Sequence, residues 1–207
     1  MRGCPFPYLR PRAKIHRALL LPALALAAVP GPLNCSVTTI VGTGAAGDNG
    51  DGGPAVAAGL NYALGTLTDP SNNLYVASEV GNKVRFVNMT STIISTVVGT
   101  GTMGCTTAPG AALAANIKYP FSLGFQPGLL IVVDQGCNCV RAVNVSGYMT
   151  TFAGTCGSIG TSTGDGTPAA NATLNVPTRL RVSASNDVCV RVAWAGVWRG
   201  ALPAAVF

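Results

Sequence analysis

Residues 72–88 read NNLYVASEVGNKVRFVN, and residues 128–144 read GLLIVVDQGCNCVRAVN, which is nearly the same pattern placed 56 residues later. The surrounding chain repeats as well, since TIVGTG at 39–44 returns as TVVGTG at 96–101 and as TFAGTC at 151–156. Gly42, Gly99 and Gly154 open the three copies. Self-similarity at a nearly fixed period predicts a repeat architecture in which each copy is one structural unit.

Each copy has the composition of short β-strands. Val, Ile, Thr and aromatic residues form runs that Gly, Asn, Asp and Ser separate, which is the strand-and-turn pattern. We expect strands at 73–78, 83–88, 93–98, 129–133, 139–144 and 149–153, and no more than single helical turns in AVAAGL and AALAAN. Four strands in a radially repeated unit make a β-propeller blade. The predicted fold class is all-β: a partial, open β-propeller of four-stranded antiparallel blades, preceded by a leader helix.

The strings GDGGPA (50–55), NNLYVA (72–77), NKVR (82–85) and VGTG (41–44) resemble the NHL-repeat family of β-propellers over roughly residues 37–190. The resemblance implies a ring of about six blades that mostly serves as a platform for protein, carbohydrate or RNA, a minority of members being lyases. Two places depart from the pattern. Ser78 stands where the second copy has Asp134, and TTAPGAA (106–112) replaces GDGGPA. The repeat-signature positions are Gly42, Gly99, Gly154, Asn82, Asn138, Arg85, Arg141 and Asp134.

We interpret these signature residues as structural. The glycines permit a turn with positive φ where one copy hands over to the next. The asparagines hold the hairpin between the second and third strands, and the arginines brace neighbouring blades. Asp51 and Asp165 recur because Asp-Gly makes a tight turn. A calcium loop around Asp48 and Asp51 is the alternative, although the distal Glu of such a loop is missing.

The third copy stops matching after Val190. We therefore divide the repeat region 37–190 into copies at 37–95, 96–150 and 151–190, followed by an aberrant tail at 191–207. Two and a half blades do not close a ring, and an open array leaves a strand edge and a hydrophobic face unpaired. The pattern indicates a truncated or wrongly joined gene model, and the alternative is a short protein that completes its ring by oligomerising.

Residues 1–30 have the features of a secretory signal peptide. Five cations and no acid precede an apolar stretch at 18–29, which is followed by Pro30. The apolar stretch of 12 residues is shorter than the roughly 20 that a membrane span needs. A signal anchor and an organelle transit peptide are the alternatives. We predict a secreted or cell-surface protein, with an organelle lumen as the alternative location and membrane contact only through an uncleaved anchor.

Removing the leader also removes most of the net charge. The chain carries +6, with 13 Lys and Arg against 7 Asp and Glu, and five of the cations lie in residues 1–17. The remaining eight cations nearly balance the seven acids. Because a nucleic-acid track needs a basic surface, we predict no nucleic-acid partner.

Cysteines and sequons indicate an oxidising compartment. Six cysteines follow the leader, and six allow fifteen disulfide pairings among which the sequence does not choose. Cys137 and Cys139 would share one face of a strand, which leaves a metal site as an alternative to disulfides or buried thiols. Asn-x-Ser/Thr sites make four asparagines candidates for glycosylation: Asn34, Asn88, Asn144 and Asn171.

Catalytic chemistry has few candidate residues. The one histidine, His16, lies in the predicted leader, so the rest of the sequence lacks the commonest general base and metal ligand. We predict no catalytic, cofactor-binding or metal-binding residue and no cofactor. The predicted function is a non-catalytic scaffold that binds an unidentified protein or carbohydrate. The alternative is a fragment of a propeller lyase or hydrolase whose catalytic blades are missing.

Overall fold

The computed structural model describes residues 36–158, 161–193 and 196–200, the last of these as backbone alone. The predicted leader and its helix, together with Asn34 and Cys35, lie outside the described residues. The strands are β1 (Ala63–Thr68), β2 (Leu74–Ser78), β3 (Lys83–Asn88), β4 (Ile93–Val98), β5 (Gly110–Ala111), β6 (Pro120–Gln126), β7 (Leu129–Asp134), β8 (Cys139–Asn144), β9 (Tyr148–Ala153), β10 (Pro177–Val182), β11 (Val188–Val192) and β12 (Gly196–Gly200). Short 3-10 turns are η1 (Ala55–Ala57), η2 (Ala112–Ala114), η3 (Gln135–Cys137) and η4 (Ala169–Asn171).

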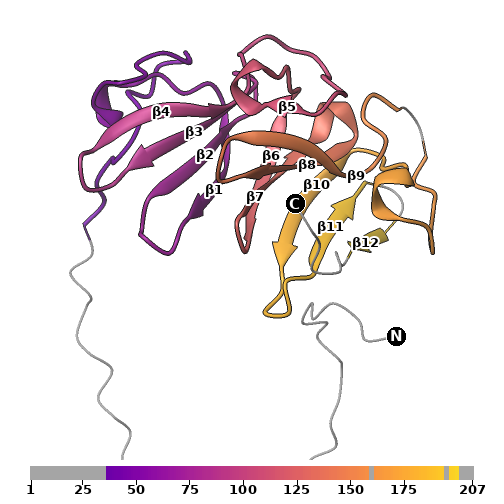
Figure 1. Ribbon diagram of the computed structural model, residues 1–207. Helices are drawn as coiled ribbons and strands as arrows, with labels where there is room; N and C mark the ends of the chain where they lie inside the picture. Colours follow the sequence, from indigo (N-terminus) through magenta and orange to yellow (C-terminus); the bar gives the residue numbers. More distant parts are fainter. Residues whose placement is uncertain (1–35, 159–160, 194–195, 201–207) are drawn as a thin grey trace, which may run out of the picture. The chain divides into compact units, whose positions relative to one another are not determined.

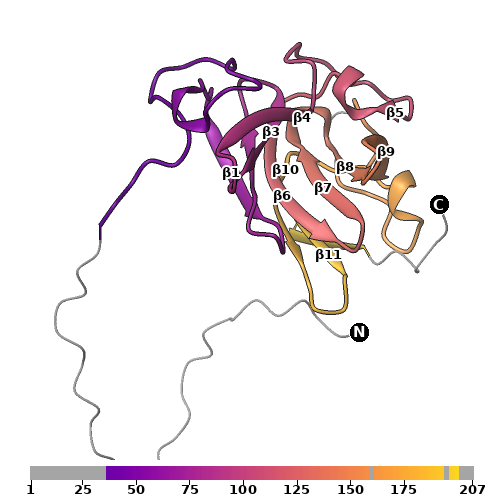
Figure 2. The same cartoon turned by 60° about the vertical axis from the view of Figure 1, so that its left-hand side comes forward.

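The strands form three antiparallel sheets that follow one another along the chain (Figure 1). Their strand orders are β1-β2-β3-β4, β5-β9-β8-β7-β6 and β10-β11-β12. The strands β1, β6 and β10 lie side by side, with β6 in contact with both of the others (Figure 2). Neighbouring sheets therefore contact each other through β1, β6 and β10. A series of antiparallel sheets arranged in this way is a partial β-propeller whose ring is open. The predicted all-β fold class is confirmed, as are the predicted strands.

Apolar residues alternate along the strands, so each sheet has two faces to cover. One buried cluster, which includes Ala77 and Val132, fills the space between the first and second sheets. A second, which includes Val133 and Val190, lies between the second and third sheets. The other face of the first sheet is covered by its own linker, through Ala55 and neighbouring residues. Two of the three buried clusters thus lie between neighbouring blades, as in a propeller.

The linker that enters each sheet folds the same way in all three copies. The N–H groups of the three repeat glycines donate to the carbonyls of an alanine 13 or 15 residues further on, each at 2.9 Å: Gly42 to Ala55, Gly99 to Ala112 and Gly154 to Ala169. The φ angles of these glycines are 91°, 92° and 85°. The predicted glycine turn is therefore confirmed.

Asn82 and Asn138 end the connections from the second to the third strand, in the left-handed conformation with φ of 52° and 56°. The predicted hairpin role is confirmed, and the structure adds a contact to the next blade. Asn82 Oδ1 accepts the N–H of Tyr119 at 3.1 Å, and Asn138 Oδ1 accepts that of Val176 at 2.9 Å. Each asparagine therefore fixes one hairpin and the start of the following sheet together.

The third sheet extends further than the sequence indicated. Backbone pairing places Gly196–Gly200 against β11, with Val190 opposite Trp198. The first part of the predicted aberrant tail is therefore a strand. The local sequence does not predict this strand because it lacks the turn residues that precede the corresponding strand in the other copies.

A comparison of two glycines tests the repeated turn. A Cβ at Gly99 would collide with the carbonyl oxygen of Asn82, whereas a Cβ at Gly44, also at positive φ, meets nothing within 4 Å. We expect Gly44→Ala to cost roughly 1–2 kcal/mol for the backbone conformation alone. Gly99→Ala should cost roughly 1–3 kcal/mol more because the hairpin must move. Urea unfolding of the two variants measures the difference, and equal losses would contradict this account of the turn.

Candidate functional site

Arg85 is the centre of the first sheet's polar interior. Its side chain is 0% exposed and pairs with the linker that precedes the sheet. The guanidinium donates to Asp51 Oδ1 at 2.6 Å and to the carbonyls of Asn49 and Gly59 at 3.0 and 3.2 Å, and it lies 3.5 Å from Asp48 Oδ1. Both carboxylates of the calcium-loop alternative thus face a buried cation. Their arrangement is that of an ion-pair cluster.

Arg141 has the same position in the second sheet and is 1% exposed. Its Nε donates to Asp134 Oδ2 at 3.1 Å, and its Nη1 donates to the Thr151 hydroxyl at 3.2 Å. Asp134 Oδ1 accepts the backbone N–H of Lys118 at 2.8 Å. Asp134 and Arg141, both singled out from the sequence, therefore form one buried pair within a blade. Arg85 joins its blade to the linker, so bracing between neighbouring blades falls to the asparagines.

The two departures from the repeat pattern compensate for each other. Ser78 stands at the position of Asp134, and its hydroxyl accepts the N–H of Asn61 at 3.0 Å as the carboxylate of Asp134 does in the next copy. The Ser78 hydroxyl is neutral and cannot form an ion pair with Arg85. In this copy Asp48 and Asp51 of the linker supply the negative charge. The second copy has no acid in its linker but has one at the end of its strand. Arg85 therefore pairs with acids of the linker, whereas Arg141 pairs with the acid at the end of strand β7.

Burial sets the acidity of these carboxyls. It raises the pKa of Asp134 to about 6, against the opposing charge of Arg141 and the N–H of Lys118. Burial also raises the pKa of Asp48, although Ser78 and Arg85 act in the other direction. The pKa of Asp51 is lowered. Partial burial acts to raise it, but the Thr96 hydroxyl and Arg85 together have the larger effect.

Two disulfides replace this ionic anchoring in the second copy. Cys105 is bonded to Cys137, and Cys139 is bonded to Cys156, so the linkers before and after the second sheet are tied to the two sides of Asn138. The expectation that Cys137 and Cys139 share one strand face is wrong because Cys137 belongs to η3.

The first copy anchors the same place without a disulfide. Asp48 precedes Cys105 by one repeat, and its carboxylate packs against Gly81, the counterpart of Cys137. The glycine leaves the room that the carboxylate fills. Cys189, in the third sheet, is also disulfide-bonded.

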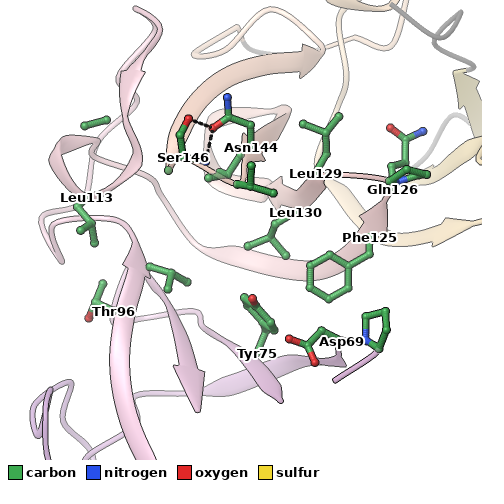
Figure 3. Close-up of a pocket in the computed structure, with 18 residues that line it drawn as sticks. Asp69, Tyr75, Thr96, Leu113, Phe125, Gln126, Leu129, Leu130, Asn144 and Ser146 are labelled. Carbon is green, nitrogen blue, oxygen red and sulfur yellow. Dashed lines mark hydrogen bonds between the residues drawn. The ribbon is translucent and has the colours of Figure 1, made fainter. Parts of the chain in front are cut away.

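A groove of about 810 Å³ lies between the first and second sheets (Figure 3). Strands β2, β4, β6 and β7 and the turns around 126–129 and 144–147 line it. Tyr75 and Phe125 meet edge to face at its base, with ring centroids 5.1 Å apart. Leu129, Leu130 and Leu113 add aliphatic surface. Its volume and apolar lining are those of a small-ligand or side-chain pocket.

The polar groups at the edge of the groove are largely committed to its turns. Asp69, the one charged residue among the lining residues, accepts the N–H and the side-chain amide of Asn73 at 2.8 and 3.0 Å. Asn144 Oδ1 accepts three hydrogen bonds, from the N–H and hydroxyl of Ser146 and the N–H of Tyr148. Burial, and then the charge of Asp69, raises the pKa of Tyr75, so its hydroxyl remains a proton donor. The groove therefore offers a mainly apolar surface with one acid, Asp69, among its lining residues.

The predicted glycosylation sites lie on turns. Asn88 and Asn144 end β3 and β8, and the Oδ1 of each accepts N–H groups of the turn that follows. Their side-chain nitrogens take no part in these bonds. Asn171 is exposed in η4. No helix in the described part of the chain has the length and hydrophobicity to cross a bilayer.

No protein-family model matches the chain, and no curated protein matches its sequence. Among solved structures, it is similar to a protein of unknown function from Bacteroides thetaiotaomicron VPI-5482, with 21% identity and a TM-score of 0.53 over 62% of this chain and 32% of that one. It is also similar to an auxiliary nutrient binding protein from Bacteroides ovatus ATCC 8483, with 16% identity and a TM-score of 0.50 over 60% and 33%. The chain spans about a third of the length of these neighbours. At such identities the likeness shows the propeller-type fold alone.

The buried pair of the second sheet predicts a pH dependence of stability. Asp134 has a pKa of about 6 in the folded chain against 3.8 ordinarily, so the folded chain binds more protons between about pH 4 and pH 6. We expect the contribution of Asp134 to the free energy of unfolding to fall as pH rises through this window. Asp134→Asn should remove that fall, as measured by urea unfolding at several pH values. Parallel profiles of the parent and the variant would contradict the assignment.

Proposed function

We propose that this chain is a non-catalytic, secreted or cell-surface protein of the NHL-repeat type, and that its blades form a scaffold binding protein or glycan in the groove between the first and second sheets. The groove itself is the observation that carries the proposal. It presents an aromatic pair and several leucines on a rigid base of strands. Its single acid is held by Asn73. Such a surface suits an apolar peptide side chain or the C–H face of a sugar.

The disulfides support the proposed location. Cys105–Cys137 and Cys139–Cys156 are of the kind that persists in oxidising compartments. The sequons on the turns after β3 and β8 agree with passage through a glycosylating compartment. The basic head and short apolar stretch of residues 1–30 supply the route.

The groove is tested by a charge placed at its edge. The secreted full chain is screened on a glycan array and against a displayed peptide library, and each enriched ligand is measured with Leu113→Asp. Leu113 is 59% exposed, so the variant should fold while a carboxylate enters the apolar surface. We expect at least roughly tenfold weaker binding, the scale of losing one apolar anchor.

Val56→Asp is the matched control because Val56 is 52% exposed and lies outside the groove. It should bind as the parent does. Ligands that bind Leu113→Asp and the parent equally would remove the groove from the proposal. Turnover of a screened lactone or ester by the parent chain would favour the enzyme alternative.

Glycosylation is tested with substitutions that keep the backbone hydrogen bonds of the turns, although Ser146→Ala removes the bond from the Ser146 hydroxyl to Asn144 Oδ1. Thr90→Ala and Ser146→Ala destroy the sequons of Asn88 and Asn144, yet the backbone N–H bonds to each asparagine Oδ1 remain. We expect each variant, secreted from animal cells, to lose one glycan on a gel, and the double variant to lose two. Treatment with a glycosidase should bring all forms to one mobility. Unchanged mobility of both single variants would show that these turns are not modified.

A further inference from the structure

The outward face of the third sheet carries three arginines, Arg179 and Arg181 on β10 and Arg191 on β11, which we call the arginine face. Leu180 and Val190 pair across the two strands and are buried against the second sheet. Because side chains alternate along a strand, the neighbouring arginines point the other way. All three are exposed, and none takes part in the ion pairs found among the described residues.

The equivalent positions in the first two sheets are small or apolar. In the first sheet they are Gly65, Leu67 and Ala77; in the second they are Ser122, Gly124 and Val133. A Cβ on Gly65 would come within 2.6 Å of the Phe121 carbonyl oxygen, and one on Gly124 within 2.7 Å of Leu180 Cδ2. At Gly65 and Gly124 the blades approach each other more closely than a side chain would allow. At the third sheet the same positions hold guanidinium side chains.

The presence of arginine at these positions excludes a further blade as the occupant of the face. A further blade, or the first sheet of a second copy, would collide with Arg179 if it packed as β6 packs on β1, because Arg179 stands where β1 has Gly65. The hot spots of protein interfaces are enriched in arginine, tyrosine and tryptophan and lie in fully desolvated pockets, whereas these three arginines are exposed on an open sheet face. The described residues of the arginine face are the three arginines and Cys189, which lies opposite Arg181, is buried and is disulfide-bonded, so the exposed groups of the face are charged.

The face fits a polyanion. Alternate residues on one strand lie roughly 6.6–6.8 Å apart, and directly opposed residues on neighbouring strands roughly 5 Å apart. A linear polymer with regularly spaced anionic groups can therefore contact all three side chains at once. Guanidinium groups bind sulfate, carboxylate and phosphate oxygens through two parallel hydrogen bonds. The two disulfides place the chain in an oxidising compartment, where the polyanions at hand are glycans rather than nucleic acids.

We propose that the arginine face is a binding site for a sulfated, anionic polysaccharide. The site is separate from the groove, since the second sheet lies between them. It also alters the conclusion drawn from composition. Eight cations against seven acids beyond the leader indicated no basic surface, yet the fold collects three of those cations on one sheet face.

The test uses the full oxidised chain and heparin as the probe. Affinity is measured by calorimetry and by the salt concentration that elutes the chain from immobilised heparin. Each of Arg179→Ala, Arg181→Ala and Arg191→Ala should weaken binding roughly fivefold, the effect of one cation at an anionic surface. The triple variant should lose about a hundredfold and show a shallower salt dependence. The three side chains are exposed and form no ion pair with another described residue, so the variants should keep the parent's circular dichroism and thermal midpoint.

Lys118→Ala is the matched control because it removes one cation elsewhere, where the ammonium lies over the Tyr119 ring at 5.8 Å. It should bind heparin within twofold of the parent. Leu113→Asp should do the same, so failure of the groove and failure of this site are distinguishable. Undiminished binding by the triple variant, or equal loss with Lys118→Ala, would overturn the proposal. Binding of desulfated heparin or single-stranded DNA as tightly as heparin would overturn the assignment to a sulfated glycan.

Discussion

A guanidinium buried away from water needs an anion beside it, because an unpaired buried charge costs several kcal/mol. The first two sheets are organised around this constraint. Arg85 and Arg141 lie at the same place in their blades with almost no exposed surface. Around Arg85 the anions come from the linker, which must then fold back over the sheet. Around Arg141 the anion comes from the end of a strand, so the linker is free to change its sequence.

That freedom explains how the linker of the second copy is held. Without acids to place against Arg141, it is attached by Cys105 to Cys137, at the point where Asp48 packs on Gly81 in the first copy. A salt-bridged carboxylate and a disulfide thus do the same mechanical task one repeat apart. A disulfide typically contributes about 2–4 kcal/mol, and removing one partner of a buried ion pair costs about 3–5 kcal/mol, so losing either anchor would have an effect of similar size.

Much of this fold was predictable because it depends on local chemistry. Strand composition, the repeated glycine and the left-handed asparagine are properties of a few adjacent residues, and each appeared where the sequence indicated. The strand at 196–200 was not predictable because pairing with β11, and no local signal, defines it. Disulfide connectivity and the groove depend on residues far apart in the chain. In the sequence Phe125 is one of several aromatic residues in predicted strands. Only the packing of β6 against the first sheet brings it into contact with Tyr75.

The polarity of the outward faces of the first and third sheets was also not predictable from the local sequence. On β1, Thr66 and Thr68 are exposed at the positions where Leu123 and Phe125 of β6 pack against the first sheet. The arginine face is the counterpart at the other end. An open array was expected to leave a hydrophobic face unpaired. The exposed residues found there include Thr66 and Thr68 of β1 and the three arginines of the third sheet, although Leu64 of β1 is also 45% exposed. Of the large apolar residues exposed in the described part of the chain, Leu113 and Val145 line the groove between the first and second sheets, and this is the apolar surface that the proposed ligand would contact.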